Sequence, residues 1–149
     1  PSCELNRADE EGLFYGFPFQ HALNIKDPEF GDIESGYDYV QPILELGAHV
    51  APTGIAFYNN NFHFPEEFKN NLFITLHGSW NRSSKVGYKV LRVVLNEAGE
   101  VTATEDFITG WLQGQKVVGR PSAPLVMSDG SLLISDDKIN VIYRITYTK

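Results

Sequence analysis

The chain has 149 residues, of which 12 are Lys or Arg and 19 are Asp or Glu, so its formal net charge is −7. Hydrophobic residues make up 42% and charged residues 21% of the chain, which excludes a disordered polyelectrolyte. The acidic balance argues against a nucleic-acid partner, because binding to phosphates requires a basic surface. No run of the sequence approaches the ~20 apolar residues of a membrane-spanning helix, so we expect no membrane partner.

The start of the chain, Pro1-Ser2-Cys3, contains no initiator methionine. We therefore expect the sequence to be a piece of a longer polypeptide. Cys3 is the single cysteine, so it cannot form an internal disulfide or a Cys-based zinc site. The cysteine content thus leaves the redox compartment, and with it the localisation, unknown.

Strand patterns dominate the middle of the chain. Short apolar runs that are rich in β-branched and aromatic residues are bounded by Pro, Gly and Asn turn signals. They predict four strands, at residues 54–58, 72–76, 88–95 and 101–108. Four strands within roughly 55 residues predict an antiparallel meander, that is, one complete propeller-like blade.

The same order of strands recurs in the C-terminal part. Apolar runs separated by Asp-containing turns predict three more strands, at residues 124–127, 131–135 and 141–147. Segment 72–74 matches segment 132–134 in composition and order, and segment 90–93 matches segment 142–145. A repeat of this kind, in which each unit is a small antiparallel sheet, is typical of a β-propeller.

The first 50 residues are less regular. Two apolar segments, 13–18 and 39–46, predict the outer strands of a preceding blade. Segment 19–38 contains Pro28, two glycines and scattered acidic residues, which predict a long surface loop. We therefore predict one all-β domain, a partial β-propeller, over residues 1–149. Its parts are outer strands plus loop over 1–50, a complete blade over 51–110 and the last blade over 111–149.

Several motifs occur in an order that resembles one known family. The motifs are Glu4-Leu5-Asn6-Arg7, Tyr15-Gly16-Phe17-Pro18, Val50-Ala51-Pro52-Thr53-Gly54, His77-Gly78-Ser79-Trp80-Asn81-Arg82, Gly87-Tyr88-Lys89-Val90, Gly119-Arg120-Pro121 and Asp129-Gly130-Ser131-Leu132. This set resembles the C-terminal half of the glucose/sorbosone dehydrogenase family, six-bladed β-propellers that use pyrroloquinoline quinone (PQQ). The resemblance covers nearly the whole chain. Single motifs are weak signals, and the ordered combination carries the resemblance.

The resemblance implies that PQQ lies over the propeller axis, held by cationic side chains and Ca²⁺, and that a small-molecule sugar is the substrate. A base would take a proton from a sugar hydroxyl while hydride passes to the quinone. PQQ carries several carboxylates, so Arg side chains and polar donors are the chemistry expected to hold it. The family pattern places five cofactor-binding candidates in this chain: His49, His77, Trp80, Arg82 and Arg120. The resemblance also implies a periplasmic or secreted location.

Departures from the family pattern limit what this chain is expected to do alone. Cys3 stands where the family has an acid near the metal, and Ser122 stands where a second basic residue often follows Arg120. The family's catalytic His lies in an earlier blade, so no residue here is predicted to be catalytic. The second hypothesis is therefore a propeller module that binds and assembles but does no chemistry.

Three of the candidates also have a structural interpretation. His49 lies in an apolar stretch and could be a hydrogen-bonded core residue. Trp80 could pack within a blade loop, and Arg120 could form an ion pair with an acid of a neighbouring blade. Both interpretations of each residue stay open at the level of sequence.

Metal-dependent chemistry is a third hypothesis, because the Asp-Gly-Ser-Leu hairpin also occurs in lactonase-type propellers. Clustered aspartates at 129, 136 and 137 would suit Ca²⁺, which prefers oxygen ligands. However, they flank two different turns, where Asp residues commonly accept local backbone hydrogen bonds. We therefore predict a structural role for these acids and no metal ligand in this chain.

The length gives a last expectation. A blade takes roughly 40–50 residues and a closed propeller needs roughly four to eight blades. The 149 residues therefore correspond to about three blades, half of a six-bladed ring. Because unpaired blade edges are adhesive, we expect missing blades of the same polypeptide, or a second copy, to close the ring.

Overall fold

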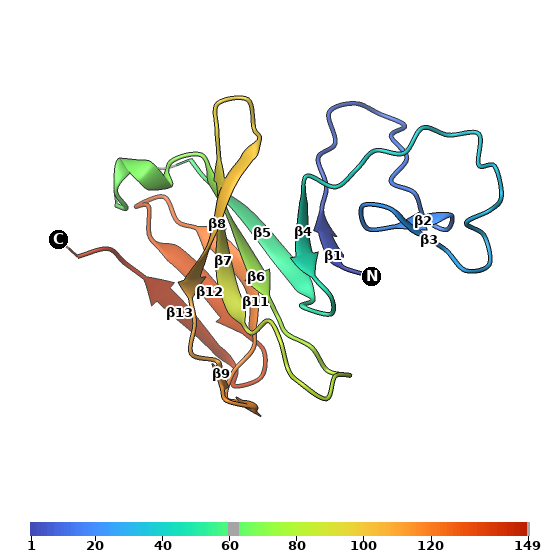
Figure 1. Ribbon diagram of the computed structural model, residues 1–149. Coiled ribbons are helices and arrows are strands. Elements are labelled where there is room, and N and C mark those ends of the chain that lie inside the picture. Colours follow the sequence, from blue (N-terminus) through green and yellow to red (C-terminus); the bar gives the residue numbers. More distant parts are fainter. Residues whose placement is uncertain (60–62, 149) are drawn as a thin grey trace. The chain divides into compact units, whose positions relative to one another are not determined.

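The structure is a computed structural model that describes residues 1–59 and 63–148 (Figure 1). Within these residues the chain forms small antiparallel sheets and one 3-10 turn, η1 (Glu66–Phe68). This arrangement confirms the predicted all-β class and the partial β-propeller. The chain divides into two compact units, Pro1–Ala48 and His49–Lys149. No helix among the described residues is long and apolar enough to cross a membrane.

A four-stranded meander forms the centre of the second unit and confirms the strands expected there. Its strands follow chain order: β5 (Pro52–Tyr58), β6 (Asn71–Leu76), β7 (Lys89–Leu95) and β8 (Val101–Ile108). Every residue of β6 is buried, which explains why apolar residues lie on both of its faces instead of alternating with exposed polar ones. The turn between β7 and β8 closes where Asn96 Oδ1 accepts the amides of Ala98 and Glu100.

The second sheet of this unit has three strands, β11 (Pro121–Val126), β12 (Leu132–Asp136) and β13 (Val141–Ile145). Its first strand packs closely against the meander. The hydroxyls of Thr53 and Thr75 both donate to the Ser122 carbonyl, at 2.6 and 2.7 Å. A Cβ on Gly54 would lie 2.6 Å from Pro124 Cδ, so glycine is required for this approach.

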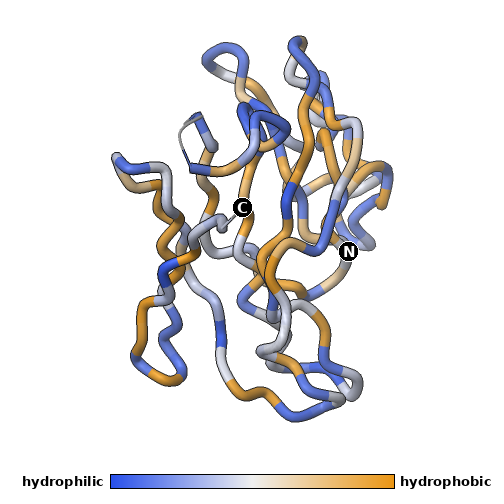
Figure 2. Tube along the Cα trace, turned by 90° about the vertical axis from the view of Figure 1, so that its left-hand side faces the viewer, coloured by the Kyte–Doolittle hydropathy of each residue, from blue (hydrophilic) through white to orange (hydrophobic). Residues whose placement is uncertain are grey.

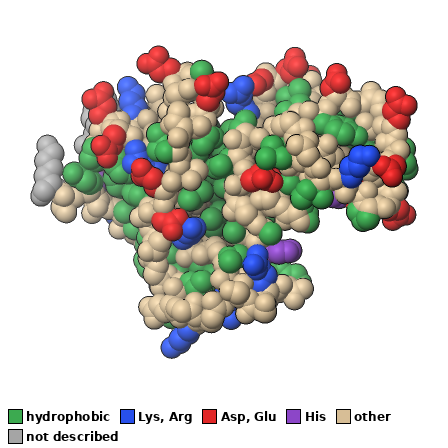
Figure 3. All heavy atoms as spheres, in the orientation of Figure 1, with side chains coloured by type: hydrophobic (Ala, Val, Ile, Leu, Met, Phe, Trp, Pro, Cys, Tyr) green, Lys and Arg blue, Asp and Glu red, His purple; other side chains and the backbone are tan. Residues whose placement is uncertain are grey.

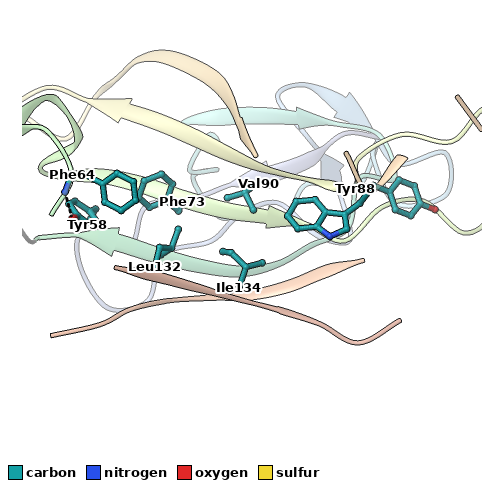
Figure 4. Packing of buried hydrophobic residues seen from close by; sticks show 8 residues of the cluster. Tyr58, Phe64, Phe73, Tyr88, Val90, Leu132 and Ile134 are labelled. Atoms are coloured by element: carbon teal, nitrogen blue, oxygen red, sulfur yellow. Dashed lines mark hydrogen bonds between the residues drawn. The ribbon is translucent and has the colours of Figure 1, made fainter. Parts of the chain in front are cut away.

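The core of the second unit lies between these two sheets (Figure 4). The cluster consists of Tyr58, Phe64, Phe73, Tyr88, Val90, Trp111, Leu132 and Ile134. At one end the Tyr58 ring meets Phe64 and Phe73 edge-on, at centroid distances of 5.2 and 5.9 Å. The buried Tyr58 hydroxyl donates to the Gly130 carbonyl at 2.8 Å and accepts the Phe64 amide at 3.1 Å. These bonds connect the hydrophobic core to the β11–β12 turn.

The first unit is held by short pairings. β1 (Cys3–Leu5) pairs with β4 (Leu44–Gly47), and β2 (Gln20–His21) forms a hairpin with β3 (Ile25–Lys26) inside the segment expected to be a loop.

The strand expected over 13–18 is reduced to a single bridge between Phe14 and Tyr39. Gly16, with φ +100°, interrupts extended backbone there. Aromatic packing of Phe14 with Tyr37 and Tyr39 replaces a ladder of hydrogen bonds.

The surface reflects the composition. The Cα trace has hydrophobic stretches within the strands and hydrophilic residues at several loop tips (Figure 2). Asp and Glu side chains are spread over the face seen in Figure 3, with Lys and Arg interspersed among them. This distribution agrees with the net charge of −7.

Candidate functional site

Four segments gather at one end of the second unit, the lower end in Figure 1. They are residues 49–51, 77–88, 109–120 and 136–140, and we call them the Arg120 end. Backbone bonds tie the first two together, since the His77 and Gly78 amides donate to the Ala51 and Val50 carbonyls, each at 2.9 Å. The side chain of Gln115 accepts the Lys85 amide at 2.7 Å and connects the third segment.

Arg120 lies at the centre of these segments, directly before β11. Its Nε donates to the His77 carbonyl at 3.2 Å and its Nη2 to the Gly78 carbonyl at 2.7 Å. The guanidinium carbon lies 5.6 Å from the centroid of the Tyr88 ring, within the range of a cation–π contact. Among the described residues, Nη1 donates no hydrogen bond. Arg120 is therefore a fixed cation with one donor nitrogen left for a ligand.

Two glycines make this geometry possible. Gly78 has φ +98°, and a Cβ there would lie 2.5 Å from the buried ring of Tyr88. A Cβ on Gly119 would overlap the side chains of Asp136 and Trp111, so glycine lets the backbone before Arg120 pass close to both. The His-Gly-Ser and Gly-Arg-Pro motifs thus have a packing role in holding Arg120.

His77 and Asp137 form a pair across 60 positions of sequence. His77 Nε2 lies 2.8 Å from Asp137 Oδ1 and 3.1 Å from Oδ2. The His77 side chain is 17% exposed and that of Asp137 59% exposed. The hydrogen bond from His77 is the main cause that lowers the pKa of Asp137 below its usual value, and the charges of His77 and Arg120 act in the same direction. Asp137 is therefore an ionised acceptor at neutral pH.

The three aspartates considered for Ca²⁺ separate into two kinds. Asp129 and Asp136 accept local backbone amides, from Ser131 at 3.0 Å and from Lys138 at 3.0 Å, as the turn interpretation predicts. Asp137 instead faces a residue of another sheet, which turn chemistry did not predict. No group of three or more His, Cys, Asp or Glu side chains suited to a metal occurs within residues 1–59 and 63–148.

The other candidate residues lie in the loops of the Arg120 end. Trp80 is 85% exposed, so the alternative in which it packs within the blade is wrong. Arg82 is exposed and its Nε donates to the Ser84 carbonyl at 3.1 Å. His49 is exposed, with a left-handed φ of +63°, which rules out the core alternative. Of the five predicted residues, His77 and Arg120 are joined by a hydrogen bond between described atoms, from Arg120 Nε to the His77 carbonyl.

Comparison with known proteins now places the fold in a family. The TrAA12-like family model matches residues 8–148. The chain belongs to this family. An uncharacterized protein of Borreliella burgdorferi is 40% identical over the whole chain, which spans 40% of that protein's length. The PQQ-dependent pyranose dehydrogenase of Coprinopsis cinerea is 31% identical over 67% of the chain, a match that covers 11% of the enzyme.

Solved structures agree with the expected propeller. The calcium structure of the Trichoderma reesei Carbohydrate-Active Enzymes Family AA12 protein matches 97% of this chain with a TM-score of 0.74 and 23% identity. The holo form of the Coprinopsis cinerea pyranose dehydrogenase PQQ domain matches 91% with a TM-score of 0.69 and 25% identity. The chain spans 42% and 40% of those two chains. These matches confirm the resemblance inferred from the motifs.

Proposed function

We propose that this chain forms part of a PQQ-dependent sugar dehydrogenase propeller and that the Arg120 end contributes to the cofactor-binding surface. One observation carries this assignment. Arg120 is held by two backbone carbonyls and by Tyr88, yet it keeps one guanidinium nitrogen without an acceptor among the described residues. An anionic ligand binds well to a cation whose position is already fixed by the protein and which still has a nitrogen free to donate a hydrogen bond.

The side chains of the Arg120 end fit an anionic quinone. Arg120 Nη1 would donate to a carboxylate of PQQ, and the exposed Arg82 on the neighbouring loop adds positive charge. The carboxylate of Asp137 accepts a hydrogen bond from His77 and interacts with the charge of Arg120, so it does not face a ligand alone. When bound, PQQ supplies the hydride acceptor for oxidation of a sugar. The described acids of this chain do not fit a Ca²⁺ site by themselves.

Completion of the ring is part of the proposal. The chain spans about 40% of the relatives that it matches along its whole length. The rest of the propeller would come from other blades of the same polypeptide or from a second copy. A catalytic base would lie in those blades, because the family pattern assigns that role to no residue of this chain.

Titration with PQQ in the presence of Ca²⁺ tests the assignment. We expect a saturable change in the PQQ absorbance, and we expect Arg120→Ala to raise the Kd about 10- to 100-fold, the effect of losing a charge-assisted hydrogen bond. Arg144→Ala is the matched control, because Arg144 is exposed and pairs with Asp129 at the other end of the unit. If the folded protein does not bind PQQ at high micromolar concentration, or if both variants bind equally, the proposal is wrong.

A propeller module without chemistry is the second candidate. Ser122 and Cys3, which depart from the family pattern, favour it. Reduction of an artificial electron acceptor in the presence of PQQ, Ca²⁺ and an aldose distinguishes the two. Once the ring is completed by the other blades or by a second copy, turnover that depends on all three components excludes the non-catalytic module, whereas PQQ binding without turnover supports it.

A further inference from the structure

The His77 ring uses its two nitrogens differently. Nε2 faces both carboxylate oxygens of Asp137, at 2.8 and 3.1 Å, while Nδ1 makes no hydrogen bond with the described residues. An ionised carboxylate can only accept hydrogen bonds, so the nitrogen that faces it must carry a proton. In a neutral imidazole the other nitrogen then has a free lone pair. Asp137 therefore decides which nitrogen of His77 is the acceptor.

The local structure fixes Asp137 in this position. The neighbouring Asp136 is buried, and its Oδ1 accepts the amides of Lys138 and Ile139 at 3.0 and 3.2 Å. Its Oδ2 accepts the Tyr143 hydroxyl at 3.2 Å, and that hydroxyl accepts from Trp111 Nε1 at 3.2 Å. These bonds hold the end of β12, so the next side chain, Asp137, leaves the strand in a defined direction.

The backbone of His77 is fixed as well. Its amide donates to the Ala51 carbonyl and its own carbonyl accepts from Arg120 Nε. The ring and the carboxylate are thus anchored from two different sheets before they meet. A hydrogen bond between two fixed partners orients the ring, which is how carboxylates position histidines in many protein sites.

We propose that Asp137 is a positioning residue that keeps the His77 proton on Nε2, so that Nδ1 accepts a hydrogen bond from a hydroxyl group of the sugar. The choice of ligand rests on the proposed function, whereas the choice of nitrogen rests on the His77–Asp137 geometry alone. Arg120 and His77 would then recognise two different kinds of chemical group. Arg120 donates to an anion, and His77 accepts from a neutral hydroxyl.

Nitrogen-15 NMR of histidine-labelled protein tests the first part without any cofactor. Spectra are recorded near pH 9, above the ordinary imidazole pKa, and the His77 signals are assigned with His77→Gln. We expect Nε2–H as the single detected tautomer in the wild type and a mixture of both tautomers in Asp137→Ala. Asp129→Ala, which removes a comparably exposed aspartate, should leave the His77 signals unchanged.

The second part is tested by adding D-glucose to the same samples, with and without PQQ. We expect the Nδ1 resonance of His77 to move upfield in the wild type and to move less in Asp137→Ala, where part of the population carries the proton on Nδ1. If that variant does not fold, Asp137→Asn replaces it, because its amide can donate to Nε2 and so allows the other tautomer.

Each result has one meaning. A wild type with the proton on Nδ1, or a tautomer ratio that Asp137→Ala leaves unchanged, overturns the positioning role. An Nδ1 resonance that does not respond to several hundred millimolar glucose in either condition overturns the hydroxyl-acceptor role. Absence of PQQ binding together with the expected tautomers would refute the proposed function while leaving the positioning role intact.

Discussion

Two arginines at opposite ends of the second unit are used in different ways. Arg92 in β7 is 7% exposed, and all three of its guanidinium nitrogens are bonded. Nε donates to Asn71 Oδ1 at 2.6 Å, Nη1 to Glu105 Oε2 at 3.1 Å, and Nη2 to the Glu67 carbonyl. The guanidinium carbon also lies 4.0 Å from the centroid of the Phe68 ring. Every guanidinium nitrogen of Arg92 therefore has an acceptor within the protein.

Arg120 has the same kind of anchoring but a smaller set of partners. Two carbonyls and one aromatic ring hold it, and its third nitrogen has no acceptor among the described residues. A part-buried arginine is therefore not by itself a sign of a binding site. A guanidinium nitrogen that has no acceptor within the protein distinguishes a cation available to a ligand from a structural one.

Removing the Arg92 side chain should lower the free energy of unfolding more than any other change considered below. Arg92→Ala leaves the buried Asn71 Oδ1 without its donor and also removes the bond to the Glu67 carbonyl and the contact with the Phe68 ring, so we expect the free energy of unfolding to fall by about 3–5 kcal/mol. Urea denaturation measures this loss. Arg144→Ala, at an exposed ion pair, should cost less than about 1 kcal/mol. Equal losses in the two variants would show that Arg92 is not the structural cation that its contacts indicate.

Gly78→Ala tests how the Arg120 end is built. The new Cβ would meet the Tyr88 ring at 2.5 Å on a backbone with φ +98°, so strain and overpacking should together cost about 2–4 kcal/mol. Gly110→Ala is the matched control, because Gly110 also has a positive φ, +116°, but its Cβ would meet nothing within 4 Å. The difference between the two variants in urea isolates the collision with Tyr88. No difference would mean that the 77–88 loop can move away from the ring.

Tyr58→Phe tests the hydrogen bonds at the end opposite to Arg120. The variant keeps the ring but removes the hydroxyl that joins the Gly130 carbonyl and the Phe64 amide. Two buried backbone groups lose their partner, so we expect a loss of about 1–3 kcal/mol in the free energy of unfolding. PQQ binding should be unchanged, since the Arg120 end is untouched. A weakened PQQ Kd would show that the two ends are coupled.

The sequence predicted the second unit well because its signals are local. Alternation, β-branched residues and turn residues lie within each strand or beside it, and the four-stranded meander followed from them. The segment 13–18 was predicted less well, because aromatic contacts with Tyr37 and Tyr39 hold it instead of a ladder. In that segment, tertiary packing overrode strand propensity.

The site was predicted in part, because its local motifs can be read in the sequence and its long-range contacts cannot. His77 and Arg120 were found through motifs, whereas the partner of His77 was missed because 60 positions separate it from Asp137. Neither residue spacing nor turn chemistry predicts that the ends of β6 and β12 lie close together. Arg92 was also missed, although it shares a strand face with Val90 in an apolar run, a pattern that signals a cation with buried partners.

At the end of the second unit opposite to Arg120, a change at Asp129 should alter stability only in acid. Hydrogen bonds from the hydroxyl and amide of Ser131, with help from Arg144, lower the pKa of Asp129 from 3.8 to about 2. Because the folded-state pKa lies below the unfolded one, the stabilising contribution is complete above about pH 4 and is lost as the pH falls toward about 2. Urea midpoints measured through this window should fall less steeply in Asp129→Asn than in the wild type. Ser131→Ala should flatten the profile in the same way, because it removes the hydroxyl that is the main cause of the shift. If both variants reproduce the wild-type profile, the acid sensitivity of the protein arises elsewhere. Asp137 at the Arg120 end is then the next carboxylate to test, because its pKa is also lowered.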